Sequence, residues 1–338
     1  MNWGCQSRNP RYAVVLGLTI LAAGVCMSVP SLAADCTLIK VASLDIDPTL
    51  SDAIAVPVTI NGAPRKFLVD TGGVVSTVFD DAAAELHLDP LPGGNGAIMY
   101  DAAGKKLDRS VTAASFGIGE MHGSNLHFVL VPNHDGSNDV VGTLAPDMLR
   151  NFDVDFDFAA RKLNLFSPNH CEGQVVYWAT AYADIPFSLD SNHITIPVTL
   201  DGQDIKAMID TGSTRTLISA GAAKRLFHID NNSPGVERIP GTTADSLVQF
   251  RYRFKSLVID GVTVNNPSVE LLPDLMEQKM NRDMETEFGI VAHNPIYGPT
   301  VDAPRFIVGL DVLRKLHLYI AYREHKLYVT AADASVGH

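Results

Sequence analysis

The chain has 338 residues, of which 46% are hydrophobic and 19% are charged. This composition is typical of a globular protein with enough chain for two domains, and it excludes disordered and fibrous proteins. The formal net charge of −12 argues against a nucleic-acid partner, because no basic patch dominates that could neutralise phosphates.

Residues 1–33 are typical of a cleavable signal peptide. Arg8 and Arg11 form a basic flank, and an apolar run follows over residues 12–29. Small residues then precede Ala33, so we expect cleavage after this residue or the next. An uncleaved anchor is the alternative, because the apolar run is near the lower length limit for spanning a bilayer. The sequence therefore predicts a periplasmic or secreted protein that contacts the membrane only if this segment is retained.

Two of the four cysteines remain after such a cleavage, Cys36 and Cys171. An even pair in an exported chain is most simply a disulfide, and we predict a bond between them. It would tie the start of the mature chain to the segment between its two halves. Two free thiols are the alternative, which an oxidising compartment disfavours.

The first half of the chain is predicted to consist of short strands separated by turns. An alternating strand over residues 54–60 is followed by Asn61-Gly62, a strong hairpin signal, and by a return strand over residues 65–69. After a short strand over residues 74–79, a short helix is expected over residues 80–86. Further strands are expected over residues 97–100, 105–107, 111–118, 126–131, 152–158 and 162–166.

The second half repeats this plan. A shift of 140 positions (210 minus 70) places residues 196–202 over 56–62. The downstream segment 308–314 matches 144–150 at a shift of 164 (308 minus 144), so the second half carries an insertion within residues 275–304. Long loops inside compact domains are usually functional or disordered, and we expect this one to form a lid or rim of a cleft.

Each repeat carries an Asp-Thr-Gly triplet at the same place, Asp70-Thr71-Gly72 and Asp210-Thr211-Gly212. An acid on a tight turn between two buried strands needs hydrogen bonds or a proton to be tolerated. One triplet alone is a weak signal, because ordinary turns also contain it. The same triplet in register within a duplicated unit predicts that the two acids meet.

Short strands with few helices predict an all-β protein, mainly β with short helices, rather than a parallel α/β sheet. We expect two tandem β-barrel-like lobes over residues 34–168 and 184–338, joined by a linker over residues 169–183.

Each triplet is followed downstream by an apolar segment and the pattern Asp-x-Leu. In these features the sequence resembles the aspartic peptidase superfamily of retropepsin-like and pepsin-like proteins. The likeness covers both repeats. It implies two acid-protease lobes related by a pseudo-two-fold axis in a single chain, which is expected to act as a monomer like exported bacterial members of this kind.

The resemblance implies that Asp70 and Asp210 are the catalytic pair. Two carboxyls about 3 Å apart share one proton and titrate as a coupled pair. The ionised one would take a proton from a water, and the protonated one would polarise the scissile carbonyl. No metal and no cofactor are expected.

The resemblance also implies roles for the residues around the pair. Thr71 and Thr211 would bond across the axis, while Gly72 and Gly212 would bring backbone amides to the carboxylates. Tyr100, on the predicted hairpin after the first triplet, is by position a candidate for the Tyr of a flap.

The sequence departs from the family pattern at two places in the first repeat. Gly73 stands where the second repeat has Ser213, whose hydroxyl could orient Asp210. Ala145 stands where the second repeat has Gly309, and its methyl group could crowd the turn behind the catalytic loop.

Other polar residues are expected to be structural. The 11 histidines show no metal-binding spacing such as His-Glu-x-x-His, and His170 reads as part of the linker. Arg150 and Arg314 follow equivalent leucines, and we expect them to pair with Asp147 and Asp311.

The sequence thus predicts an exported aspartic endopeptidase that binds an extended peptide or protein substrate by strand-like pairing. The alternative is a non-catalytic peptide-binding module that retains the acid-protease fold, as Gly73 and Ala145 suggest. A structural envelope protein is disfavoured, because a buried acidic pair costs stability without a use.

Overall fold

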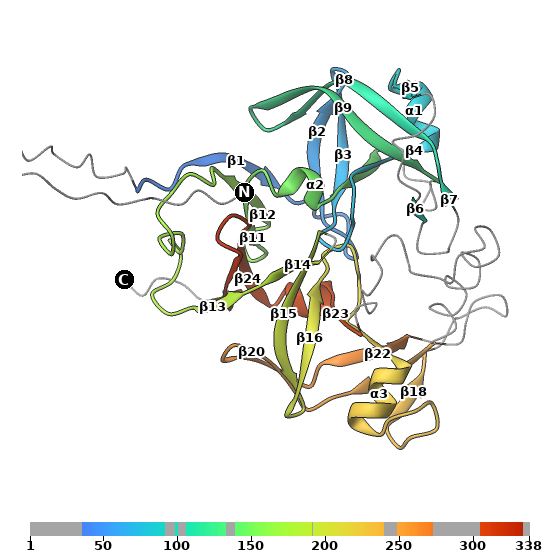
Figure 1. Ribbon diagram of the computed structural model, residues 1–338, viewed down its shortest axis with the longest axis vertical. Coiled ribbons are helices and arrows are strands. Elements are labelled where there is room, and N and C mark those ends of the chain that lie inside the picture. Colours follow the sequence, from blue (N-terminus) through green and yellow to red (C-terminus); the bar gives the residue numbers. More distant parts are fainter. Residues whose placement is uncertain are drawn as a thin grey trace, which may run out of the picture. The chain divides into compact units, whose positions relative to one another are not determined.

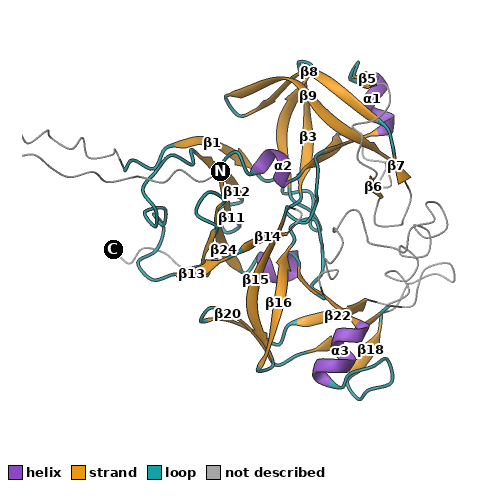
Figure 2. Ribbon diagram, viewed as in Figure 1, coloured by secondary structure: helices purple, strands orange, loops and turns teal. Residues whose placement is uncertain are grey.

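The computed structural model describes residues 36–91, 99–100, 106–132, 139–190, 192–239, 249–272 and 305–333. Strands account for most of the regular structure, as Figure 2 shows, and the helices have four to eight residues. The prediction of a mainly β protein with short helices is confirmed. Among the described residues, no helix combines the length and the apolarity needed to cross a bilayer.

The first lobe is built on a seven-stranded sheet in the order β2-β3-β10-β4-β9-β8-β5, in which β2 also pairs with β8. That additional pairing closes the sheet into a barrel (Figure 1). Val56, Val58 and Ile60 alternate inward along β2, and Asn61 and Gly62 both take positive φ angles that make the predicted hairpin turn. The elements are β2 (Ala55–Ile60), β3 (Ala63–Val69), β4 (Thr77–Phe79), α1 (Asp80–Glu85), β5 (Asp89–Leu91), β8 (Ser110–Ile118), β9 (Met121–Val131), β10 (Val140–Leu144) and α2 (Pro146–Leu149).

The second lobe repeats this arrangement in a ten-stranded sheet. Its strands run in the order β18-β19-β22-β17-β23-β16-β15-β20-β21, and β14 pairs with β15. The long strand β9 of the first lobe corresponds here to two strands, β21 and β22. The elements are β14 (Ser188–Asp190), β15 (His193–Leu200), β16 (Gln203–Ile209), β17 (Leu217–Ser219), α3 (Ala220–Phe227), β18 (Val236–Arg238), β19 (Phe250–Arg253), β20 (Ser256–Ile259), β21 (Val262–Asn265), β22 (Ser268–Leu272), β23 (Phe306–Val308) and α5 (Leu310–Leu313).

A third sheet is shared between the two halves of the chain. Its order is β1-β12-β11-β24-β25-β13, and the halves meet where β11 pairs with β24. These strands were expected in separate lobes, and their joining into one sheet is a difference that the structure reveals. The strands are β1 (Lys40–Asp45), β11 (Asp153–Asp157), β12 (Lys162–Phe166), β13 (Ala183–Pro186), β24 (Leu316–Ala321) and β25 (Lys326–Ala331).

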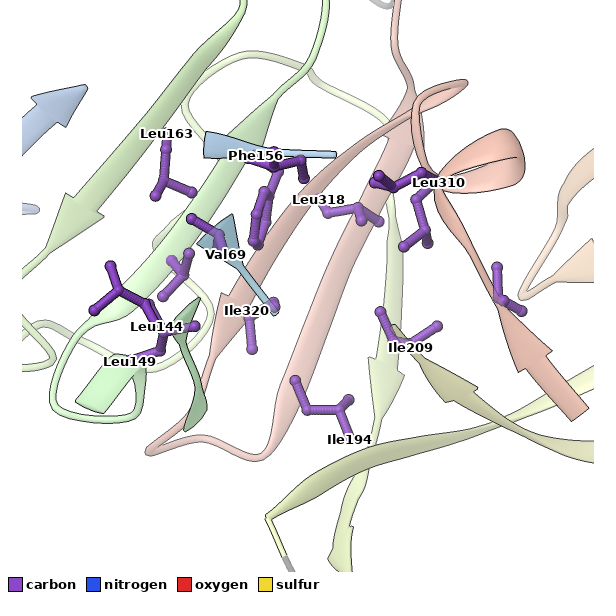
Figure 3. Packing of buried hydrophobic residues seen from close by; sticks show 14 of the residues in the cluster. Val69, Leu144, Leu149, Phe156, Leu163, Ile194, Ile209, Leu310, Leu318 and Ile320 are labelled. Atoms are coloured by element: carbon purple, nitrogen blue, oxygen red, sulfur yellow. The ribbon is translucent and has the colours of Figure 1, made fainter. Parts of the chain in front are cut away.

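The shared sheet is buried on both faces, which explains why β24 has no exposed residue along its length. One face contributes Phe156, Leu318 and Ile320 to a core that also holds Val69 and Ile209 from the two lobes (Figure 3). The other face is covered by the segment between the lobes, whose Val175 and Trp178 pack on Phe166, Tyr319 and Tyr328. The predicted linker is therefore a packed part of the fold.

The disulfide between Cys36 and Cys171 is present, with the two Cα atoms 4.9 Å apart. The predicted pairing is confirmed, and it fixes the strand β1 side of the shared sheet to the segment between the lobes. The predicted lid or rim within residues 275–304 lies outside the described residues, as does the predicted signal peptide.

Candidate active site

Each Asp-Thr-Gly triplet begins where a central strand of its lobe ends. In the first lobe β10 runs parallel to β3, with Leu144 opposite Val69, and the amide of Asp70 donates to the Leu144 carbonyl at 2.9 Å. In the second lobe β23 runs beside β16 in the same way, and the amide of Asp210 donates to the Val308 carbonyl at 3.1 Å. The same strand geometry therefore fixes both acids.

The threonines of the triplets join the two lobes. The Thr71 amide donates to Thr211 Oγ1 at 3.0 Å, and the Thr211 amide donates to Thr71 Oγ1 at 3.0 Å. Each hydroxyl then donates across the lobes, from Thr71 to the Ile209 carbonyl at 2.8 Å and from Thr211 to the Val69 carbonyl at 2.7 Å. Both threonines are fully buried. Four buried hydrogen bonds thus hold the two acidic loops in a fixed relation.

Each carboxylate accepts two backbone N–H groups from its own loop. Asp70 Oδ1 accepts from Gly72 and Gly73 at 2.9 Å each. Asp210 Oδ1 accepts from the two residues that follow Thr211, at 2.8 and 3.1 Å. These amides favour the ionised form of each acid and orient its second oxygen away from the loop.

The two acids face each other closely enough to dictate the residue type at the third triplet position. A Cβ atom on Gly72 would overlap the Asp210 carboxyl group, and a Cβ atom on Gly212 would overlap the Asp70 carboxyl group. Only glycine leaves room for this approach. Each carboxyl group therefore lies against the loop that carries the other, so the structure brings the predicted pair together.

Burial and mutual proximity make it costly for both carboxyls to ionise, so the pKa values of the two acids are coupled. Burial raises the pKa of Asp70, and the hydrogen bond that Asp70 accepts from Asp210 opposes this shift. Burial and the negative charge of Asp70 both raise the pKa of Asp210. The negative charge of Asp70 thus favours the protonated form of Asp210. Both residues keep part of their surface open to solvent, as a site that receives water and substrate requires.

The Ser213 side chain does not act as expected. Its hydroxyl donates to the Arg215 carbonyl at 2.8 Å, and only its backbone N–H contacts Asp210. The hydroxyl is engaged within the turn that follows the triplet, and the contact with Asp210 that the structure shows is made by the backbone N–H.

Gly73 and Ala145, the two departures from the family pattern, are in contact. A Cβ atom on Gly73 would lie 3.2 Å from the Ala145 methyl carbon and 3.1 Å from Asp70 Oδ2. In the second lobe the larger residue is Ser213 and the smaller is Gly309, where a Cβ atom would overlap the Arg215 carbonyl. Each lobe thus has one small and one larger residue at this contact, and the absence of a side chain at Gly73 relieves the crowding expected from Ala145.

Two hydroxyl residues behind the loops were missed in the sequence. Ser76 Oγ donates to Asp147 Oδ1 at 2.7 Å and accepts the Ala145 amide at 3.0 Å. Thr216 Oγ1 likewise donates to Asp311 Oδ1 at 2.7 Å and accepts the Gly309 amide of its own lobe at 3.2 Å. The signal was available, since a hydroxyl residue follows each catalytic-loop acid by six positions (76 minus 70, 216 minus 210).

The two arginines are structural, but their partners lie in the opposite lobe. Arg150 Nη1 donates to Asn192 Oδ1 at 3.1 Å, and Arg314 Nη2 donates to the Ala53 carbonyl at 3.0 Å. They were expected to pair with aspartates of their own lobe. The length of the arginine side chain allows them to reach the segment that precedes the first strand of the other sheet.

Tyr100 lies in β6 (Met99–Tyr100), opposite Lys106 of β7 (Lys106–Leu107). The backbone forms the expected pair of strands, but the side chain of Tyr100 lies outside what the structure describes. Its role in a flap stays a prediction.

Comparison with known proteins agrees with this geometry. A family model described as aspartyl protease matches residues 56–144 and 196–291, which together make up more than half of the chain. The two matches begin 140 positions apart (196 minus 56), the same shift that relates the two triplets. No curated protein matches the chain. The family's domain thus occurs twice in the chain, and in each copy an Asp-Thr-Gly triplet follows a central strand. The chain therefore belongs to the aspartyl protease family.

Proposed function

We propose that the protein is an exported aspartic endopeptidase that hydrolyses peptide bonds with a water activated between Asp70 and Asp210. The observation that carries this proposal is the close approach of the two carboxyl groups, each of which lies against the glycine of the opposite triplet. Family membership supports a protease in general, and the matched pair supports the specific reaction.

In the proposed reaction Asp70 is the base and Asp210 is the acid. Water attacks the peptide carbonyl carbon as Asp70 accepts a proton from that water, and Asp210 gives its proton to the carbonyl oxygen. A tetrahedral gem-diol forms. It collapses when the C–N bond breaks, a hydroxyl proton returns to Asp210, and the proton held by Asp70 passes to the leaving nitrogen. The products are a carboxylic acid and an amine, and the pair regains its single proton.

The loops around the pair support this assignment by holding the reacting oxygens in place. Backbone amides bind one oxygen of each acid, so the other oxygen is left for the water or the substrate. The threonine hydrogen bonds between the lobes prevent the acids from separating. Both acids come from one chain, so the proposal requires no second copy. The substrate would be a peptide or protein segment bound in extended form.

Substitution of each acid tests the proposal. Asp70→Asn and Asp210→Asn keep the shape of the side chain but remove the base or the acid. Cleavage of casein or a peptide library from about pH 3 to 7 should fall by about 100- to 10,000-fold in each variant. Asp204→Asn, on the exposed part of β16, is the matched control and should cleave normally. Full cleavage by either catalytic-pair variant contradicts the proposal.

A peptide-binding module without catalysis is the second candidate. Gly73 and Ala145 motivated it, but their mutual fit leaves the loop of Asp70 with the same amide hydrogen bonds as that of Asp210. Tight binding of peptides by the parent protein with no cleavage at any pH would favour this candidate over the enzyme.

A further inference from the structure

Asn192 is a residue of the second lobe that contacts the first catalytic loop. It lies immediately before β15, and its side-chain amide donates to the Val74 carbonyl at 3.0 Å. Val74 directly follows Gly73, whose backbone N–H donates to Asp70 Oδ1 at 2.9 Å. The hydrogen bond from Asn192 therefore reaches the part of the loop that holds Asp70, although Asn192 belongs to neither Asp-Thr-Gly triplet.

Arg150 fixes the orientation of this side-chain amide. Its Nη1 donates to Asn192 Oδ1 at 3.1 Å. A guanidinium group can only donate and a backbone carbonyl can only accept, so a single orientation of the amide satisfies both neighbours. The oxygen faces Arg150 and the NH2 group faces Val74. Because Arg150 ends α2 of the first lobe, the contacts run from that lobe through Asn192 and back to the first catalytic loop.

The second catalytic loop is stabilised by a hydrogen bond of its own. Ser213 Oγ donates to the Arg215 carbonyl at 2.8 Å, within the turn after the triplet. The shift of 140 that relates the repeats places Gly73 at the position of Ser213 (213 minus 140). Glycine has no hydroxyl, so the first loop cannot form the matching bond to the Val75 carbonyl. The first loop thus lacks a support that the second loop has.

The contact of each loop with the opposite lobe also differs in the direction of its hydrogen bond. In the second loop the Thr214 hydroxyl donates to the Asp52 carbonyl at 3.1 Å. The shift of 140 matches Thr214 with Val74 and Asn192 with Asp52 (214 minus 74, 192 minus 52). Val74 has no side-chain donor, and here the opposite lobe supplies one. The two contacts occupy equivalent places, but only the first depends on a side chain that lies outside the loop.

We infer that Asn192 is a positioning residue of the active site, which gives the first loop the support that the Ser213 hydroxyl gives the second. The inference rests on the proposed function for its effect on catalysis. Gly73 carries no side chain that could restrict the loop, so its amide needs support from elsewhere to stay on Asp70 Oδ1. By holding Val74, Asn192 keeps this amide in place and leaves the second oxygen of Asp70 for the water or the substrate.

Two substitutions of Asn192 remove its hydrogen bond in different ways. Asn192 has a φ of 73°, which glycine adopts readily, so Asn192→Gly removes the amide without backbone strain. Asn192→Asp keeps the shape and the partner Arg150, but near neutral pH it places a carboxylate oxygen against the Val74 carbonyl. Both variants should lower kcat by about three- to tenfold with little change in KM.

Asn266 provides the matched control. It is exposed, it has a φ of 51°, and it lies in the turn after β21. Asn266→Gly and Asn266→Asp make the same chemical changes at a similar backbone conformation, and they should leave both kcat and KM unchanged.

A rescue experiment distinguishes positioning from a merely structural contact. Gly73→Ser combined with Ala145→Gly supplies the first loop with the hydroxyl that the second loop has. In that background the loop can form its own bond to the Val75 carbonyl, so Asn192→Gly should lower kcat by less than about twofold. If Asn192→Gly is harmless in the parent, or equally harmful in both backgrounds, the inference is wrong.

Hydrogen exchange of the loops tests the same support without turnover. In Asn192→Gly the backbone amides of residues 72–75 should exchange about tenfold faster than in the parent, and those of residues 212–215 should not change. Exchange at the parent rate contradicts the support by Asn192. A parent protein that cleaves no peptide contradicts the proposed function instead, and the exchange rates still decide whether Asn192 holds the loop.

Discussion

At the scale of single residues, the two catalytic loops are alike in sequence and differ in what lies behind them. Gly73 and Ala145 form the contact in one lobe, and Ser213 and Gly309 form it in the other. The sequence showed these differences as departures from a pattern, but it could not show that they touch. In each lobe a glycine faces the larger residue of the contact. The change from serine to glycine at position 73 therefore makes room for the change from glycine to alanine at position 145.

Restoring the family residue at one member of this contact should be harmful, and restoring both should not. Gly73→Ser would force its Cβ against the Ala145 methyl group, so we expect a loss of about 1 to 3 kcal/mol in the free energy of unfolding. Ala145→Gly added to Gly73→Ser should recover most of that loss. Urea unfolding of both single variants and the double variant measures this coupling, and strictly additive effects would contradict it.

Removal of a threonine hydroxyl should affect both stability and activity. Thr71→Val leaves the Ile209 carbonyl and the Thr211 amide without their partner. Two buried groups left unpaired should lower the free energy of unfolding by about 2 to 5 kcal/mol. Thr71→Ser keeps the hydroxyl and should be nearly normal in unfolding and in kcat/KM, whereas a stable and fully active Thr71→Val variant would show that the link between the lobes is dispensable.

The raised pKa of Asp210 predicts opposite effects on activity and stability. A carboxyl whose pKa is higher in the folded than in the unfolded protein favours folding at low pH, and this contribution is lost as the pH rises from the unfolded to the folded pKa. At neutral pH the unfolded chain readily gives up this proton, while the folded pair must retain it. Asp210→Asn should therefore strongly reduce cleavage yet raise the free energy of unfolding by about 1 kcal/mol or more at pH 7, with a smaller gain at pH 4. Thermal unfolding at the two pH values checks this.

The same protonation state predicts a bell-shaped pH profile for kcat/KM. Activity should fall in acid, where Asp70 gains a proton, and in alkali, where Asp210 loses its proton. Because burial raises both pKa values, the profile should extend to higher pH than the ordinary pKa of an aspartate would allow. A profile that rises without limit toward high pH would contradict a protonated Asp210.

At the scale of strands and helices, the sequence predicted the elements better than their partners. The hairpins around both triplets and the strands over residues 152–158 and 162–166 were predicted close to their observed bounds. The pairing of β11 with β24 was not predicted. The periodicity of hydrophobic residues shows that a strand is buried, but it does not show which strand lies beside it. The six-stranded sheet shared by the two halves therefore became evident only from the structure.

The shared sheet also gives a role to His170, which the sequence analysis read as linker. His170 Nε2 contacts Asp153 Oδ2 at 2.5 Å, and both side chains are almost completely buried. Asp153 also accepts from the Tyr319 hydroxyl at 3.2 Å. The sequence around His170 does not indicate this contact, because the hairpin of β11 and β12 separates Asp153 from His170 along the chain.

Removing this imidazole should leave the buried carboxyl of Asp153 with only the Tyr319 hydroxyl as a partner and without a balancing charge. We expect His170→Ala to lower the free energy of unfolding by about 3 to 5 kcal/mol at neutral pH. The double variant His170→Ala with Asp153→Asn should be more stable than the sum of the single effects, because it removes the uncompensated charge. Exposed His228→Ala serves as the control for urea unfolding, and additive single effects would show that the contact contributes little.

At the scale of the whole molecule, the duplication predicted the meeting of the two acids, and the expected signal peptide led to the prediction of the disulfide between Cys36 and Cys171. What the duplication could not predict is where the repeats diverge.

The ladder between β11 and β24 means that the peptide chain joining the two halves is not what keeps them together. Tyr182, 44% exposed just before β13, is a place where a digestive protease such as chymotrypsin could nick the folded molecule. The two resulting polypeptides would remain associated through strand pairing and the threonine contacts. The cut would turn a tandem gene product into a two-subunit assembly, each subunit still presenting its own aspartate to the other.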